Sequence, residues 1–290
     1  MIAILINEFL KVTVKNSGAE LISLKNTMTN KEYLWQGDPN FWGRRAPVLF
    51  PIVGKVNRNK YKVDGTSYEL PQHGFARDMH FEQIDHQEST LAYLLKSNDQ
   101  TLKVYPYKFE LLIKYQLERN RLIVSYDVKN IDDKVIYFSI GAHPAFNCPL
   151  EKNEKFEDYY LEFEKKETAS RCLLQDGLIS DKSAPVLKDQ NTLPLDVSLF
   201  NEDAIIFKEL RSREVAIKSK KSNHQIKMDF TGFPYFAIWS KKGGAPFVCL
   251  EPWFGIADKA GFTGEYKEKD GIRSLSKGKS FHGEYSIEIS

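Results

Sequence analysis

Turn-forming residues interrupt this chain at short intervals, and their spacing limits its possible folds more than any other feature. Between the turns lie short apolar runs, and the turns return about every 8–12 residues over much of the sequence. No segment keeps apolar residues at helical spacing for three turns. The sequence therefore predicts an all-β protein, and specifically a large antiparallel β-sandwich with few short helices.

Hairpins give the clearest individual predictions. Residues 109–118 and 121–128 alternate apolar and polar side chains and are separated by only two residues. Residues 9–14 and 19–24 are predicted to pair in the same way around a turn that contains a glycine. The other predicted strands are residues 1–8, 31–35, 91–97, 135–140, 159–163, 204–207, 214–219, 225–230, 235–240, 247–251 and 282–289.

The segments between the strands predict little further structure. Single helical turns are expected at residues 41–43 and after Asn201, and residues 176–194 are interpreted as a polar, irregular loop. This loop does not separate parts of different composition, and the chain has no internal repeat and no Pro/Gly/Ser linker. Because large β-sandwiches approach this size as single units, residues 1–290 are predicted to form one domain.

Charge and cysteine content exclude several classes of function. Lys and Arg number 41 against 39 Asp and Glu, and a net charge of +2 gives no reason to expect nucleic acid or an acidic membrane as a partner. No apolar run approaches the roughly 20 residues that span a bilayer, and the apolar start is too short for a secretory signal. Cys148, Cys172 and Cys249 form no CxxC pair, which argues against zinc and disulfides. A cytoplasmic protein is expected.

Three segments combine a chemically active side chain with a rigid turn. His143 follows an apolar run and lies between Gly141 and Pro144, so we expect it at the mouth of a sheet. His73 precedes a glycine, and Glu251 ends another apolar run and precedes a proline. Histidine moves protons near neutral pH, and a partly desolvated carboxylate has a raised pKa and is a stronger base. These residues predict one site assembled from distant parts of the chain.

Each of the three residues also has a purely structural interpretation. His73 could cap backbone groups in a loop, and His143 could satisfy buried carbonyls at a strand end. Glu251 could form an ion pair, with Arg45 or Arg77 as its partner. The sequence contains no metal-binding spacing of histidines, no dinucleotide fingerprint, no P-loop and no nucleophile elbow.

Arginine and tryptophan residues near these segments are candidates for ligand binding. Arg77 supplies a planar fork suited to oxygen ligands, and at least one of Arg44 and Arg45 is expected to point inward because apolar residues flank the pair. Trp253 could stack on a sugar face, although aromatic residues after a strand are more often part of a core. The other histidines are interpreted as surface residues: His80, His86, His224 and His282.

Together these segments resemble the aldose 1-epimerase (galactose mutarotase-like) superfamily, and specifically its LacX-like branch. The resemblance covers nearly the whole chain and rests on the combination of Arg45, residues 73–77, residues 141–144 and residues 251–252. It implies a galactose mutarotase-like β-supersandwich with its site in a concave face.

The resemblance also implies a reaction and a role for each residue. The reaction is interconversion of the α and β anomers of an aldohexose by ring opening and closure, without a cofactor or a metal. His143 would be the general acid and Glu251 the general base, while His73 and Arg45 would orient the sugar. Arg77 and Trp253 are expected to contact the substrate.

The identity of the sugar is left open. Galactose mutarotases typically carry an Asn-His pair where this chain has residues 72–77, whose His-Gly-Phe-Ala-Arg run also resembles hexose-6-phosphate mutarotases. A phosphosugar would need a pocket with two or more cations, and a neutral aldose is the expected substrate. A hexose-6-phosphate mutarotase and a non-catalytic carbohydrate-binding protein are the alternatives, and the oligomeric state is not indicated.

Overall fold

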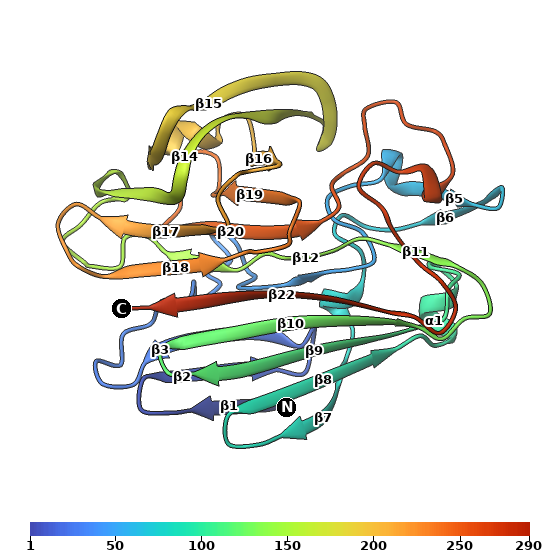
Figure 1. The fold of residues 1–290 in the computed structure, drawn as a ribbon, viewed down its shortest axis with the longest axis horizontal. Helices are drawn as coiled ribbons and strands as arrows, with labels where there is room; N and C mark the ends of the chain where they lie inside the picture. The colour runs from blue at the N-terminus through green and yellow to red at the C-terminus, as the bar shows by residue number, and fades with distance from the viewer.

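A sheet of 15 strands organises the computed structural model, which describes residues 1–290 (Figure 1). Its central path, in spatial order, is β4 (Val48–Leu49), β12 (Ile140–Ala142), β20 (Phe247–Phe254), β19 (Tyr235–Trp239), β16 (Ile205–Lys208), β14 (Tyr159–Gln175), β17 (Glu214–Ser219), β18 (Gln225–Asp229), β22 (Ser280–Ile289), β10 (Arg121–Asn130), β9 (Phe109–Glu118), β8 (Thr90–Lys96) and β7 (Glu82–His86). Off this path, β13 (Ala145–Asn147) pairs with β20, and β15 (Leu178–Pro194) pairs with β14.

Three smaller sheets and six short helices complete the fold. The sheets are β1 (Ile2–Ile6), β2 (Leu10–Lys15) and β3 (Glu20–Asn26); β5 (Lys60–Val63) and β6 (Thr66–Glu69); and β11 (Ile136–Phe138) and β21 (Arg273–Leu275). The helices are α1 (Asp99–Leu102), η1 (Asn57–Asn59), η2 (Ala76–Asp78), η3 (Phe156–Asp158), η4 (Val197–Phe200) and η5 (Tyr266–Glu268). None of these helices has the length and apolar character that crossing a bilayer requires.

One part of the main core lies between the β1–β3 sheet and the β7–β10 end of the long sheet, and the same cluster continues through β14 and β16–β20. Along β9, every second side chain from Phe109 to Leu117 is buried, which is the period of a strand with one face in the core. The Tyr115 hydroxyl donates to the Ala19 carbonyl at 2.6 Å and so ties the two sheets together. The cluster contains 68 buried residues. Full burial of one Leu or Ile side chain stabilises the fold by about 1.5–3 kcal/mol.

The structure confirms the all-β prediction and both predicted hairpins. Glu118 pairs with Arg121 across the two-residue connection of β9 and β10, and Arg119 adopts the left-handed φ of 56° that such a tight turn needs. β2 and β3 pair antiparallel as expected. All the pairings in the long sheet are antiparallel as well.

The interpretation of residues 176–194 as an irregular loop is wrong. Residues Leu178–Pro194 form β15, a 17-residue strand that pairs with β14 through several register shifts. Only three of its side chains are buried, namely Ile179, Leu187 and Leu193, so the apolar alternation that marks a strand is missing. The turn before it did carry a signal, because an Asp-Gly pair favours tight hairpins.

Two smaller expectations also differ from the structure. Residues 31–35 make isolated bridges through Glu32 and Leu34 instead of a strand. The helical turn expected after Asn201 precedes it, as η4. The expected turn at residues 41–43 begins earlier, over residues 38–42, where the amides of Phe41 and Trp42 donate to the Asp38 carbonyl.

Candidate active site

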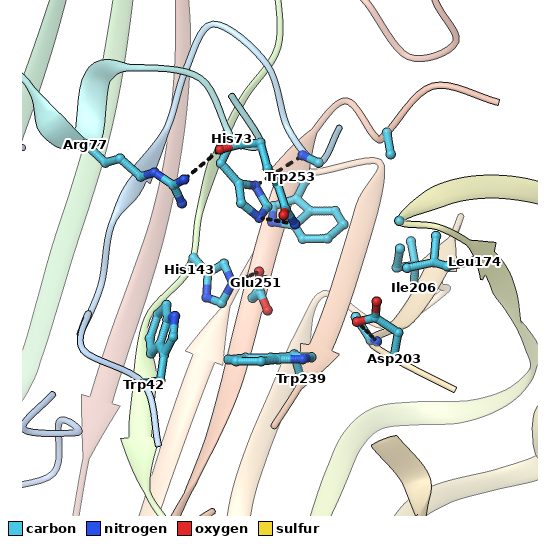
Figure 2. Close-up of a pocket in the computed structure, with 15 residues that line it drawn as sticks. Trp42, His73, Arg77, His143, Leu174, Asp203, Ile206, Trp239, Glu251 and Trp253 are labelled. Carbon is cyan, nitrogen blue, oxygen red and sulfur yellow. Dashed lines mark hydrogen bonds and ion pairs between the residues drawn. The ribbon is translucent and has the colours of Figure 1, made fainter. Parts of the chain in front are cut away.

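A cavity of about 300 Å³ opens where β12, β13, β19 and β20 meet the loops around His73 and the tip of the β14–β15 hairpin (Figure 2). Alternation along β20 sends Glu251 and Trp253 to the same face of the sheet. The residues that line the cavity are Trp42, Gly54, Gln72, His73, Arg77, His143, Leu174, Gly177, Asp203, Ala204, Ile206, Trp239, Glu251, Trp253 and Ala257.

Gly141, two residues before His143, leaves room for the Trp253 indole to pack against the backbone of β12. A Cβ at Gly141 would lie 2.5 Å from Cδ1 of Trp253, so no larger residue fits there without displacing the ring. The Trp253 indole N–H donates to the Ala142 carbonyl at 3.2 Å. Gly141 pairs with Trp253 in register, and the chain then turns at Pro144. This local packing places His143 beside Glu251.

His143 and Glu251 form a buried pair in the cavity. Nε2 of His143 lies 3.2 Å from Oε2 of Glu251, and the two side chains are 9% and 1% exposed. Burial raises the pKa of Glu251 well above its ordinary value, and the charge of Asp203 raises it further. Burial lowers the pKa of His143 to about 3, and the charge of Arg77 acts in the same direction. Both shifts favour the uncharged forms of the two groups, a protonated Glu251 beside a neutral imidazole.

His73 is held in one tautomer by the backbone. Its Nδ1 accepts a hydrogen bond from the Gly54 amide at 3.1 Å, and its own amide donates to the Gly54 carbonyl at 2.8 Å. Burial, followed by the charge of His143, lowers the pKa of His73 well below 6.5. The neutral ring must then carry its proton on Nε2, which makes His73 a hydrogen-bond donor on that side. The two histidine rings meet edge to face at 5.5 Å.

The three arginines occupy different places. Arg77 lines the cavity, where one of its terminal nitrogens donates to the Gln72 carbonyl at 2.7 Å. Its buried Nε makes no hydrogen bond and lies 3.7 Å from Oδ2 of Asp78. Arg44 pairs with Asp78 at 2.9 Å, and its charge contributes to lowering the pKa of His73 and of His143. The Arg45 side chain packs against Gly37 and is not among the groups that line the cavity.

The structure therefore brings five of the six sequence-predicted site residues together and leaves Arg45 out. The side chain that contacts Glu251 is His143, and neither Arg45 nor Arg77 forms the expected ion pair with it. Of the histidines interpreted as surface residues, three are exposed and His224 is partly buried.

Sequence reasoning missed three further residues of the cavity, Trp42, Trp239 and Asp203. The Trp42 ring stacks on His143 at 4.8 Å, and Trp239 meets the same ring edge-on at 5.7 Å. In the sequence, Trp42 lay in an expected helical turn and Trp239 in a predicted strand, with no sign of a site at either. Asp203 lies in a turn between η4 and β16 and carries no local signal at all. Only the pairing of β16 and β19 brings it near Glu251.

One group of side chains has the composition of a metal site. The donor atoms of His143, Cys249 and Glu251 all lie within 4.8 Å of one another. A thiol binds metal as the thiolate. Burial raises the pKa of Cys249 well above its ordinary value, so this thiol is protonated at neutral pH. Metal-independent activity remains a prediction, which treatment with a chelator tests.

Comparison with known proteins identifies the family. The family model for aldose 1-epimerase matches residues 2–268. Protein LacX, chromosomal, of Lactococcus lactis subsp. lactis is 39% identical over 261 residues, which cover 87% of each chain. The plasmid form of LacX from the same organism is 38% identical over an equal span.

Solved structures agree with this. A galactose mutarotase related enzyme from Lactobacillus acidophilus has a TM-score of 0.96 and 36% identity, over 100% of this chain and 97% of that one. A galactose mutarotase-like protein from Lactobacillus casei has a TM-score of 0.95 and 33% identity, over 100% of both chains. The chain described here therefore belongs to the aldose 1-epimerase family, within its LacX-like branch, and has the galactose mutarotase-like β-sandwich fold.

Proposed function

We propose that this protein interconverts the α and β anomers of a free aldohexose by opening and reclosing the sugar ring. The observation that carries the proposal is the buried contact of 3.2 Å between His143 and Glu251 in a cavity large enough for one hexose. Ring opening needs one group that removes the proton of the C1 hydroxyl and one that protonates the ring oxygen. The pair can supply both groups, with Glu251 as the base and His143 as the acid, while it holds a single shared proton.

A bound sugar favours the ionised form of this pair. The C1 hydroxyl donates a hydrogen bond to Glu251, which stabilises the carboxylate, and the ring oxygen accepts one from Nε2–H of His143. The shared proton thus moves from Glu251 to His143 without exchange with solvent. Glu251 then removes the C1 proton while His143 protonates the ring oxygen. Rotation about the C1–C2 bond and closure in reverse give the other anomer.

The remaining cavity residues bind and orient the sugar. Nε2–H of His73 donates to a sugar oxygen, and the Asp203 carboxylate accepts from a hydroxyl group. The indoles of Trp42, Trp239 and Trp253 provide flat apolar surfaces for the C–H faces of the ring. We assign no substrate contact to Arg45, because its side chain packs on Gly37.

A neutral hexose fits the charges better than a phosphosugar does. Arg77 is already bound by the Gln72 carbonyl, and Arg44 is paired with Asp78. Asp203 adds a negative charge that would repel a phosphate dianion. One observation favours the phosphosugar as a second candidate, because the buried Nε of Arg77 makes no hydrogen bond and has only a long contact of 3.7 Å with Asp78.

Turnover of glucose, galactose and glucose 6-phosphate at low and high salt separates the two substrates. If the substrate is neutral, its turnover rate should hardly change with salt. Arg77→Ala should then raise KM less than it would for a phosphosugar. A strong preference for glucose 6-phosphate that weakens with salt and with Arg77→Ala would contradict this choice.

Two variants separate an enzyme from a sugar-binding protein. His143→Asn and Glu251→Gln are expected to lower turnover by about 10²–10⁴-fold each, while at least one of them still binds sugar. His282→Asn and Glu284→Gln are matched controls, because both side chains are exposed and lie outside the cavity. If wild type binds sugar but neither wild type nor any of the four variants raises mutarotation above the buffer rate, the binding-protein alternative is correct.

A further inference from the structure

Arg171 is a buried cation that binds main-chain carbonyls. It lies on β14, is 7% exposed, and donates from Nη1 to the Leu199 carbonyl at 2.8 Å. Its Nη2 lies within hydrogen-bond distance of three successive carbonyls, those of Glu202, Asp203 and Ala204, at 2.8, 2.6 and 2.9 Å. A buried guanidinium commonly pairs with a carboxylate, but this one has no carboxylate within ion-pair distance.

The segment that Arg171 binds carries the acidic residue of the cavity. It leads from η4 into β16, and Asp203 lies at its bend with a left-handed φ of 67°. L-residues with a side chain rarely adopt this conformation, so the surrounding structure must impose it. The Ala204 amide donates to Oδ1 of Asp203 at 2.7 Å and fixes the carboxylate relative to the bend. Figure 2 shows Asp203 at the cavity, on the side away from Arg77.

The geometry of the guanidinium explains how the bend is held. Arginine presents several N–H groups in one rigid plane, so it can bind carbonyls that converge from different directions. The carbonyls of residues 199 and 202–204 all accept from this one guanidinium, and the charges of Glu202 and Asp203 favour its charged form. A lysine could neutralise the same region, but a single ammonium on a flexible stem would not fix all of these carbonyls.

We propose that Arg171 is a positioning residue for the sugar site, which holds the Asp203 carboxylate where it accepts a hydrogen bond from a substrate hydroxyl. The inference rests on the proposed function, since it assumes that the cavity binds a sugar. It adds a residue outside the cavity to the binding apparatus. It also connects the β14–β15 hairpin to recognition, because Arg171 and the cavity residue Leu174 lie on the same strand.

Kinetics of Arg171→Met, Arg171→Lys and Asp203→Asn test the proposal. All three are expected to raise KM by about tenfold or more, while kcat changes much less, because a substrate contact is lost and the acid/base pair remains. Arg171→Lys should not restore KM despite keeping the charge. Arg213→Met is the matched control, since Arg213 also donates to a main-chain carbonyl, at 3.0 Å, and lies outside the cavity.

A double variant separates positioning from general support of the fold. Once Asp203 is replaced by Asn, adding Arg171→Met should raise KM little further, because both changes remove the same contact. Effects that multiply would contradict the proposal, as would an unchanged KM in a folded Arg171→Met protein. If Arg171→Met does not fold, Arg171→Lys and its double variant with Asp203→Asn give the same comparison.

Hydrogen exchange keeps this test independent of the proposed function. The Ala204 amide should lose protection in Arg171→Met or Arg171→Lys and keep it in Arg213→Met, whether or not the protein turns over a sugar. Protection that survives in both Arg171 variants would overturn the positioning role. A wild-type protein without mutarotase activity would instead contradict the proposed function, and sugar affinity measured by calorimetry would then replace KM in the comparison.

Discussion

At the scale of single residues, the sequence singled out His143 and Glu251, which the structure brings together, but not their protonation. His143 and Glu251 each stand out because an apolar run ends at a glycine or a proline. Desolvation of Glu251 could be predicted from the run before it. The strength of the effect on both groups depends on Trp42, Trp239 and Asp203, which come from distant segments. Arg45 was assigned to the site from the family resemblance alone, because nothing local tells which of two adjacent arginines faces a cavity.

In the pH profile of kcat/KM, the acidic and basic losses of activity are expected to lie far apart on the pH scale. The active pair carries one proton. Activity should fall at low pH, when a second proton binds His143, because the pKa of His143 is lowered to about 3. Activity should also fall at high pH, when Glu251 loses its proton, and the raised pKa of Glu251 moves this loss upward. Arg77, Arg44 and Asp203 are the other charged groups near the pair, and His73 stays neutral. Initial rates measured by polarimetry across pH give the profile. An acidic limb near pH 6.5, where an ordinary histidine titrates, would contradict this assignment.

At the scale of elements, the sequence predicted strands that bury one face and missed those that do not. β9 and β10 alternate clearly, and the hairpin was found. β15 lies at an edge with only three buried side chains, and β4 has only two residues, so neither carries a periodic pattern. The turn at Asp176 and Gly177 was readable, but its strands had no apolar alternation to support it.

Gly141→Ala is expected to destabilise β12 and loosen the site. The new Cβ would lie 2.5 Å from the Trp253 ring and must displace it, which costs about 1–3 kcal/mol in an overpacked core. Gly43→Ala is the control, since the nearest atom to its Cβ is 4.0 Å away. Urea unfolding measures both. Equal stabilities of the two variants would mean that the indole does not require Gly141.

A buried ion pair fixes the segment after β20. Nζ of Lys269 lies 3.1 Å from Oδ1 of Asp258, and both side chains are nearly inaccessible. Lys269→Met would leave the Asp258 charge buried and unpaired, and we expect it to lower the free energy of unfolding by about 3–5 kcal/mol. Lys208→Met, which breaks an exposed pair with Asp270, should cost about 1 kcal/mol or less. Similar losses in the two variants would show that burial of the Lys269 pair has little effect.

At the scale of the whole molecule, turn spacing and the absence of helical periodicity were enough to predict the sandwich. The order of the strands was beyond reach, because β14 lies between β16 and β17 through long-range pairings that no local pattern specifies. That order is what brings Asp203 and His143 to one cavity. The main core draws residues from Ala3 near one end of the chain to Ile289 near the other.

A single domain predicts a single unfolding transition. The core cluster spans both ends of the sequence, so loss of one part should expose the rest and unfold it at the same denaturant concentration. Tryptophan fluorescence reports on the cavity, and circular dichroism reports on the sheets. The two signals should change together in a urea titration. Two separated transitions would contradict the prediction of one domain.

The most direct test of the central claim is the rate at which freshly dissolved α-glucose and α-galactose approach anomeric equilibrium in the presence of the protein and excess EDTA. Polarimetry follows this approach without coupling enzymes. The account predicts a rate that rises in proportion to protein concentration, persists in the chelator and falls to the buffer rate with His143→Asn or Glu251→Gln. A rate equal to that of buffer with both sugars and with glucose 6-phosphate would contradict the proposed function.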